Sequence, residues 1–196
     1  MDVDYSLYLA TDRVLMEGRD LAACVEAAIE NGVTLVQLRE KSASGRAFYE
    51  VGKRVCEITR SHGVPLIVND RVDVMLALDA DGVHVGEDDL PLGRVRALAP
   101  GKIVGYSAHT SADVEFAQEA GADYVGVGPV FPTGTKPDAG AVLGVDGVRG
   151  LVERAEIPCV GIGGITAANA AEVVQAGAAG VCVISAILGA SNPALA

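Results

Sequence analysis

The chain has 196 residues, half of them apolar, which is enough to bury one substantial core, and we expect residues 1–196 to form a single domain. Acidic residues outnumber basic ones by 26 to 15, and the formal net charge of −11 argues against nucleic-acid or anionic-membrane partners, which need a positive surface. The N-terminal segment lacks the features of a signal peptide, and no apolar run reaches the ~20 residues of a membrane helix, so we expect a cytoplasmic protein.

Short apolar runs recur along the chain and alternate with segments of helical periodicity. Most of the runs are rich in Val and Ile and too short for helices, which is typical of strands buried on both faces of a parallel sheet. The runs lie at 6–12, 35–40, 65–70, 82–86, 102–108, 123–130, 158–165 and 180–185.

Helix signals lie between these runs, most clearly at 20–32, 45–63, 111–122 and 166–178, and several of these segments end at Gly, the usual helix-stop residue. Eight alternating strand and helix segments predict a closed (β/α)₈ TIM barrel with eight parallel strands, because an open doubly wound sheet typically has about five or six strands. Little sequence follows the last strand, so we expect a short last helix.

The four cysteines, Cys24, Cys56, Cys159 and Cys182, lie far apart in apolar segments and form no CxxC pair. This pattern favours buried, reduced thiols over a zinc site or a disulfide framework.

The chemistry of such a barrel lies at the carboxyl ends of its strands, so the polar residues found there are the candidates for function. The second run leads into Gln37, Arg39 and Lys41, which period-two alternation directs to one side, while Leu38 and Glu40 point to the other. If that side faces the barrel mouth, two cations and an amide form a site for a polyanion. The alternative is a solvated strand end with salt bridges.

Polar and acidic residues stand at the ends of the next two runs: the third run ends in Asn69 and Asp70, and Glu87, Asp88 and Asp89 follow the fourth. Carboxylates at neighbouring strand ends can hold Mg²⁺ together with phosphate oxygens. They could instead balance the nearby cations, or Asp88 and Asp89 could begin the following helix.

Ser107 is expected at the mouth, after the fifth strand. His109 lies just beyond it, and we assign it no chemistry. His84 lies inside a strand, where an interior structural role and a ligand contact are equally compatible with the sequence.

The stretch GPVFPTGTKPDAG, at 128–140, follows the sixth run and carries Thr133, Gly134, Thr135 and Lys136. Its composition by itself favours an ordinary loop, and the alternative is a cradle for an anion. The loops after strands seven and eight, around Gly164, Ile184 and Ser185, are the usual phosphate site of this fold. Two anion sites, one cationic and one made largely of backbone N–H groups, indicate two anionic substrates.

These residues closely resemble the thiamine-phosphate synthase family. The resemblance runs over nearly the whole chain, through YLATD, VQLREK, LIVNDRVDVMLALDADGVHVGEDDLP, GYSAHT, ADYVGVGPVFPTGTK, GIGGI and VCVISAI. It implies a (β/α)₈ barrel that joins a hydroxymethylpyrimidine diphosphate to a thiazole phosphate and releases pyrophosphate with Mg²⁺.

The resemblance also implies roles for individual residues. Asp70 and Asp89 match magnesium ligands, and Arg39, Lys41, Ser107 and Lys136 are the candidates for catalysis. The pyrimidine diphosphate segment is matched by Gln37, Leu38, Arg39, Glu40, Lys41, Asn69, Ser107 and Lys136. The thiazole phosphate site is matched by Thr133, Gly134, Thr135, Gly164, Ile184 and Ser185.

Three features depart from the family pattern: Glu87 stands where Gln is frequent, Gly134 stands where Pro is frequent, and the last helix is short. Two other functions stay open, a thiazole tautomerase of the same fold and a non-catalytic barrel that binds a phosphorylated ligand. A homo-oligomer is compatible with the sequence, which does not decide the oligomeric state.

Overall fold

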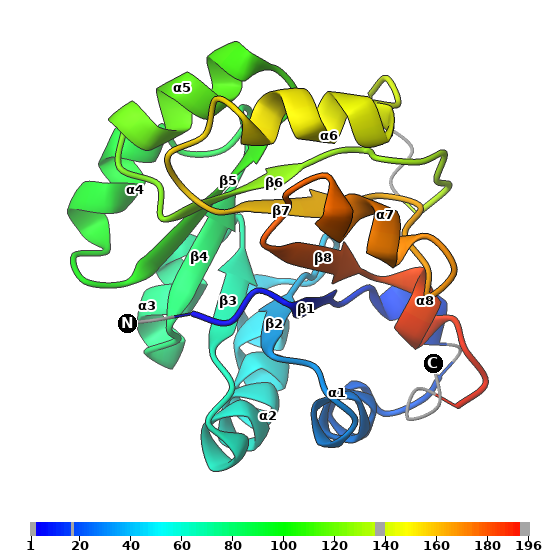
Figure 1. Cartoon of the computed structure of the whole chain (residues 1–196). Helices are drawn as coiled ribbons and strands as arrows, with labels where there is room; N and C mark the ends of the chain where they lie inside the picture. Colours follow the sequence, from blue (N-terminus) through cyan, green and yellow to red (C-terminus); the bar gives the residue numbers. More distant parts are fainter. Residues whose placement is uncertain (1–2, 17, 136–139, 193–196) are drawn as a thin grey trace.

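The structure is a computed structural model that describes residues 3–16, 18–135 and 140–192. Eight parallel strands pair in chain order, and β8 pairs with β1 to close the barrel (Figure 1). The predicted TIM barrel is therefore confirmed, and each of the eight apolar runs contains one strand. The strands are β1 (Leu7–Ala10), β2 (Leu35–Leu38), β3 (Leu66–Asn69), β4 (Gly82–Val85), β5 (Ile103–Ala108), β6 (Tyr124–Val127), β7 (Cys159–Ile162) and β8 (Gly180–Val183).

Helices surround the barrel (Figure 1). The last of them is a single turn, as the sequence predicts. They are η1 (Arg13–Met16, 3₁₀), α1 (Leu21–Glu30), α2 (Gly45–His62), α3 (Val72–Leu78), α4 (Leu92–Leu98), α5 (Ser111–Glu119), α6 (Gly144–Val152), α7 (Ala170–Gln175) and α8 (Ser185–Leu188).

Local residue chemistry explains where the helices begin and end. The Ser44 hydroxyl accepts from Ala47 N at the start of α2, and Thr110 and Asp113 form a reciprocal capping box at the start of α5. Gly63 closes α2 in the left-handed conformation. The start of α4 differs from the alternative considered above, because its N-cap is Pro91, so neither Asp88 nor Asp89 begins that helix.

The strand period of two divides the apolar residues into two cores. One cluster, which includes Leu9, Val36 and Val68, packs between the strands and the helices, and the other fills the barrel interior with Tyr8, Leu35, Ile67, Ile103, Tyr124, Val160 and Cys182. On β2, β3, β4 and β5, the interior positions nearest the carboxyl ends carry polar side chains, and these lead into the candidate site: Gln37, Asn69, His84 and Ser107.

No helix within the described ranges is long and apolar enough to cross a membrane. All four cysteines are buried and free, as predicted.

Candidate active site

A cavity of about 320 Å³ opens at the carboxyl end of the barrel. Its lining includes twelve residues that the sequence singles out, from strand ends far apart in the chain. These are Gln37, Arg39, Lys41, Asn69, Asp70, Asp89, Ser107, Thr133, Thr135, Gly164, Ile184 and Ser185.

The alternation after β2 is confirmed even though the strand ends at Leu38. Gln37, Arg39 and Lys41 line the cavity, whereas Leu38 is fully buried in the core between the strands and the helices. Glu40 also points away, and its carboxylate lies 2.8 Å from Arg13 Nη2. The structure therefore does not bring the side chains of Leu38 and Glu40 into the pocket.

Two cations of the pocket are held by carboxylates. Arg39 Nη1 donates to Asp12 Oδ2 at 2.8 Å, and the side chains of this pair are 16% and 13% exposed. The Arg39 backbone N–H donates to Thr11 Oγ1, which fixes the chain at the strand end. Lys41 Nζ lies 3.2 Å from Asp70 Oδ2 at the rim. The salt bridges expected of a solvated strand end are thus present, but they lie in the wall of the cavity.

Asp70 lies close enough to Asp89 to affect the ionisation of the Asp89 carboxyl. Burial raises the pKa of Asp89 above its ordinary value, and the charge of Asp70 adds to the rise, against the lowering effect of a 2.8 Å hydrogen bond from Gly86 N. Asp70 has a left-handed backbone, with φ 61°, inside a three-residue turn closed by Arg71 N and Asn69 O. Unfavourable backbone conformations of this kind cluster at functional sites.

The donor set fits a divalent cation shared with a ligand. Two adjacent carboxylates, one of them hard to ionise alone, suit Mg²⁺, which is bound by one or two carboxylates plus water and phosphate oxygens. Among the described residues, no group of three or more His, Cys, Asp or Glu side chains is arranged to hold a metal. A closed cage made of protein side chains alone is therefore not built from this part of the chain.

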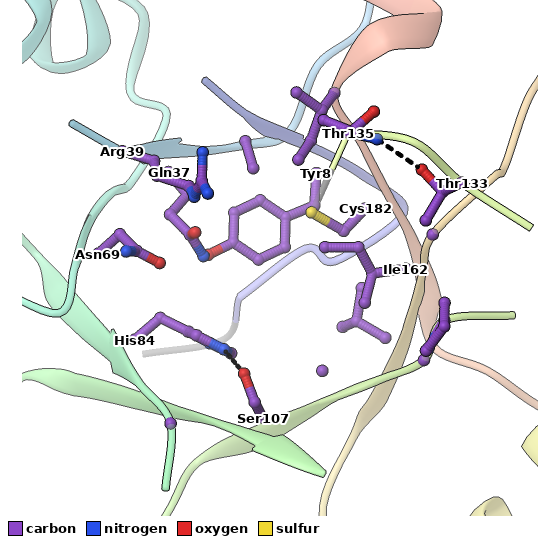
Figure 2. Close-up of a pocket in the computed structure, with 18 of the residues that line it drawn as sticks. Tyr8, Gln37, Arg39, Asn69, His84, Ser107, Thr133, Thr135, Ile162 and Cys182 are labelled. Carbon is purple, nitrogen blue, oxygen red and sulfur yellow. Dashed lines mark hydrogen bonds between the residues drawn. The ribbon is translucent and has the colours of Figure 1, made fainter. Parts of the chain in front are cut away.

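A hydrogen-bonded set of side chains lies at the floor of the cavity, and Figure 2 marks its link between His84 and Ser107. Ser107 Oγ lies 3.0 Å from His84 Nε2, and His84 Nδ1 lies 3.0 Å from Tyr124 Oη. Tyr124 Oη lies 2.8 Å from Tyr8 Oη, which accepts from Gln37 Nε2 at 2.8 Å. His84 therefore lies in the barrel interior, where its ring hydrogen-bonds to Tyr124 and Ser107 at the base of the pocket.

The loop after β6 borders the other side of the cavity. Thr133 and Thr135 line it, and the Thr135 N–H donates to Thr133 Oγ1 at 3.3 Å (Figure 2). Gly134 is exposed and is not among the lining residues. Lys136, predicted to contact the diphosphate, lies outside the described residues.

Gly164 connects this loop to the loop after β7. Its φ is +66°, and a Cβ atom there would lie 2.6 Å from the Pro132 carbonyl oxygen and 2.8 Å from Phe131 Cβ. Glycine at this position therefore allows two loops of the pocket to pack together, in addition to any contact with a ligand.

The comparison with known proteins identifies the family. The sequence profile described as "Thiamine monophosphate synthase" matches residues 7–187. The chain belongs to the thiamine-phosphate synthase family. A relative named thiamine-phosphate synthase from Desulfitobacterium hafniense (strain Y51) is 51% identical over 197 residues, which cover 100% of this chain and 95% of the relative.

A second relative and a solved structure support the same family. A thiamine-phosphate synthase from Chloroflexus aurantiacus is 53% identical, covering 97% of this chain and 88% of the relative. The solved structure of thiamine phosphate pyrophosphorylase from Pyrococcus furiosus superposes with a TM-score of 0.92 at 42% identity, covering 98% of this chain and 92% of that one. The protein is accordingly a transferase of thiamine biosynthesis, as the sequence predicts.

Within this thiamine-phosphate synthase fold, the departures noted in the sequence are accommodated. Glu87 lines the cavity as an exposed side chain, so it adds negative charge at the rim. A Cβ atom at Gly134 would meet nothing within 4 Å, so the loop has room for the larger residue frequent in the family. The last helix, α8, keeps one turn that begins at Ser185.

Sequence reasoning missed the floor of the synthase pocket. Tyr8, Tyr124 and Cys182 line it, but in the sequence they stand in apolar runs and look like ordinary core residues. His109, to which we assigned no chemistry, also lines the cavity, and its Nδ1–H donates to the Gly128 carbonyl at 2.6 Å.

Proposed function

We propose that the protein condenses 4-amino-2-methyl-5-hydroxymethylpyrimidine diphosphate with 4-methyl-5-(2-phosphooxyethyl)thiazole, or its carboxylate form, to thiamine monophosphate, with release of pyrophosphate and, from the carboxylate form, of carbon dioxide. The observation that carries this proposal is one cavity with Arg39 and Lys41 beside Asp70 and Asp89 on one wall and a glycine- and threonine-rich wall at Thr133, Thr135 and Gly164. Membership of the family supplies the identity of the substrates.

The pyrimidine diphosphate is assigned to the wall formed by the ends of β2, β3 and β5. Gln37, Asn69 and Ser107 supply polar groups near the heterocycle, and Arg39 and Lys41 supply positive charge toward the diphosphate. In a protein of net charge −11, such local cations are what an anionic ligand needs. Lys136 completes this set in the proposal, on the strength of the resemblance.

Asp70 and Asp89 are the residues that would hold Mg²⁺. When bound, the ion would offset negative charge on the diphosphate. The ion pair between Lys41 and Asp70 is compatible with this role, because a rim pair with side chains 55% and 27% exposed is weak and can rearrange when a ligand arrives.

The thiazole phosphate is assigned to Thr133, Gly134, Thr135, Gly164, Ile184 and Ser185. The support is that five of these six residues line one cavity and that Gly164 joins two of its loops. Backbone N–H groups and short hydroxyls are suited to a phosphate monoester.

The reaction needs charge stabilisation more than a nucleophilic side chain. The bond between the pyrimidine methylene and the diphosphate oxygen breaks with its electron pair on the oxygen, and Arg39 and Lys41 stabilise the charge that develops there. The thiazole nitrogen then donates its lone pair to the methylene carbon, which makes the C–N bond of the product. Ser107 and Gln37 hold the pyrimidine while this exchange occurs, and no proton has to be abstracted.

A cytoplasmic location and a single domain over residues 1–196 belong to the same proposal. Closure of the barrel and four buried free thiols, which are usual in a reducing compartment, support it.

The test is release of pyrophosphate from the purified protein with both substrates and Mg²⁺, compared with each substrate alone and with EDTA. Release that needs both substrates supports the proposal. Proton exchange on the thiazole substrate without pyrophosphate release would favour a tautomerase, and binding without any conversion would favour a non-catalytic barrel.

A further inference from the structure

Five side chains from five different strands form a continuous hydrogen-bonded chain across the barrel interior. In order, these are Gln37 from β2, Tyr8 from β1, Tyr124 from β6, His84 from β4 and Ser107 from β5, with successive separations of 2.8, 2.8, 3.0 and 3.0 Å. Its two ends, Gln37 and Ser107, line the cavity on different strands (Figure 2). We call this set the floor chain.

The two phenols inside the floor chain are neutral. Tyr8 and Tyr124 are 1% and 0% exposed, and burial raises the pKa of each well above its ordinary value. Each hydroxyl therefore carries one proton and donates one hydrogen bond. The protons can all be used within the chain only if every link points the same way, from Gln37 to Ser107 or from Ser107 to Gln37.

The orientation of the Gln37 amide selects one of these two directions. Gln37 Nε2 donates to Tyr8 Oη, so Tyr8 donates to Tyr124 and Tyr124 donates to His84 Nδ1. His84 is then the tautomer with its proton on Nε2, and this N–H donates to Ser107 Oγ. Two groups are left directed away from the chain, the Gln37 carbonyl oxygen and the Ser107 hydroxyl proton.

We propose that the floor chain fixes the hydrogen-bonding pattern by which the pocket selects its heterocycle, with Gln37 Oε1 as acceptor and the Ser107 hydroxyl as donor. A ring that bears an amino group toward Gln37 and an unprotonated ring nitrogen toward Ser107 matches this pattern, which is the arrangement an aminopyrimidine offers. This inference deepens the proposed function and rests on it for the substrate. Tyr8, Tyr124 and His84 act as positioning residues.

A glycine on β5 makes room for the floor chain. A Cβ atom at Gly105 would lie 2.2 Å from Tyr124 Cζ and 2.5 Å from His84 Nδ1, so any side chain there would displace the link between them. In an apolar barrel interior, each strand would contribute a side chain to the packing. At Gly105 the strand contributes none, and the two buried polar rings of Tyr124 and His84 occupy that space instead.

The first test reads the direction of the floor chain without using activity. Nitrogen-15 NMR of histidine-labelled protein at neutral pH should show a protonated Nε2 and an unprotonated Nδ1 for His84. The chain has three histidines, so the signals are assigned by their loss in His84→Asn. The opposite tautomer in the wild-type protein would overturn the proposed pattern.

Two variants test whether the links are coupled. A carboxylate can only accept, so Gln37→Glu should reverse every link and move the His84 proton from Nε2 to Nδ1, three hydrogen bonds away. Tyr124→Phe removes the middle link, so His84 should lose its single tautomer and show a mixture. An unchanged Nε2–H signal in Tyr124→Phe would contradict the coupling, even if Gln37→Glu fails to fold.

The third test is substrate discrimination. The wild-type protein should bind the 4-amino pyrimidine diphosphate at least about tenfold more tightly than its 4-oxo analogue, which carries a ring N–H, as measured by calorimetry. Tyr124→Phe should lower this preference by about tenfold and raise KM for the pyrimidine, with KM for the thiazole phosphate unchanged. Tyr49→Phe, on α2, is the matched control and should change neither value.

Equal weakening of both analogues in Tyr124→Phe would mean that the floor chain only supports the fold, and would overturn the inference. Failure of the proposed function is distinguishable, because it would appear as absence of pyrophosphate release by the wild-type protein, whatever tautomer the NMR spectrum shows.

Discussion

Lys41 Nζ lies 3.2 Å from Asp70 Oδ2, so a candidate diphosphate contact and a candidate magnesium ligand form one ion pair at the rim of the pocket. Asp89 is different, since its Oδ2 accepts from the Gly86 backbone N–H. Substituting Asp70 therefore removes an ion pair with a cation, whereas substituting Asp89 does not, so the two variants distinguish charge balance from metal binding. Exposed ion pairs contribute only ~0–1 kcal/mol, so Lys41 can leave Asp70 for an incoming diphosphate at little cost.

Removing a pocket cation should weaken the diphosphate substrate more than the thiazole phosphate. We expect Lys41→Ala, Arg39→Ala and Lys136→Ala each to cost about 1.5–3 kcal/mol in diphosphate binding and to slow turnover, because each removes one charge-assisted contact. Separate titrations of the two substrates measure this.

The control for this prediction is Arg54→Ala, which removes a cation from a surface pair with Asp20 on the outer layer of helices. It should leave both affinities nearly unchanged. Arg39→Ala also leaves Asp12 without its partner, so its folding is checked by circular dichroism. Equal loss of both substrates in the Lys41 variant would contradict the division into two sites.

Gly164 and Ser185 should respond very differently to small substitutions. Gly164→Ala places a methyl group 2.6 Å from the Pro132 carbonyl at a left-handed backbone position, so we expect a loss of about 1–3 kcal/mol in stability and weaker thiazole phosphate binding. Ser185→Ala should weaken the thiazole phosphate by less than about 1.5 kcal/mol, since its hydroxyl is one donor among several.

Gly93→Ala is the matched glycine control, because a Cβ atom there meets nothing within 4 Å and the residue lies within α4. It should be neutral or slightly stabilising in thermal unfolding. A Gly164→Ala variant with wild-type melting temperature and wild-type thiazole phosphate binding would show that the two loops do not need this contact.

Cys182 should resist alkylation although it lines the pocket. Burial raises the pKa of its thiol to about 12, and the reactive thiolate forms only as the pH rises toward that value. At pH 8 roughly one molecule in ten thousand carries the thiolate, so iodoacetamide should react slowly and faster as the pH is raised. Mass spectrometry measures the modification, with urea-unfolded protein as the control in which all four thiols react. Rapid labelling of native Cys182 at pH 8 would contradict this.

The sequence predicted the barrel and its mouth because both depend on short-range rules. Period-two alternation was enough to place Gln37, Arg39 and Lys41 on one side and Leu38 on the other. A residue directly after a strand is then predicted to lie at the rim of the barrel mouth, even when its neighbours in space are unknown.

The floor of the pocket could not be predicted in this way, because its contacts join distant strands. Tyr8 and Tyr124 are 116 positions apart and stand in apolar runs, so nothing local distinguishes them from core residues. One signal was available: Gln37 and His84 are polar residues at inward-facing positions, and buried polar groups need partners. Tyrosines on neighbouring inward-facing positions are the partners such groups would find.

Neutralising either acid tests whether Asp70 and Asp89 bind one Mg²⁺ that also contacts the diphosphate. If they are ligands, Asp70→Asn and Asp89→Asn should raise the magnesium concentration needed for turnover, or nearly abolish pyrophosphate release, because each loses a charged oxygen donor. If they only balance Arg39 and Lys41, the same changes leave extra positive charge, and diphosphate binding should tighten. Turnover is measured against Mg²⁺ concentration with the thiazole phosphate saturating.

Asp73→Asn provides the matched control, because Asp73 is a carboxylate of α3 paired with Arg71 and is not among the residues that line the cavity. It should keep the wild-type magnesium dependence. Asp70→Asn carries a further distinction, since it also releases Lys41 from its ion pair, whereas Asp89→Asn does not. A raised magnesium requirement in both variants therefore points to ligation. Unchanged magnesium dependence in both, together with tighter diphosphate binding in Asp70→Asn, would leave charge balance as the role of these acids.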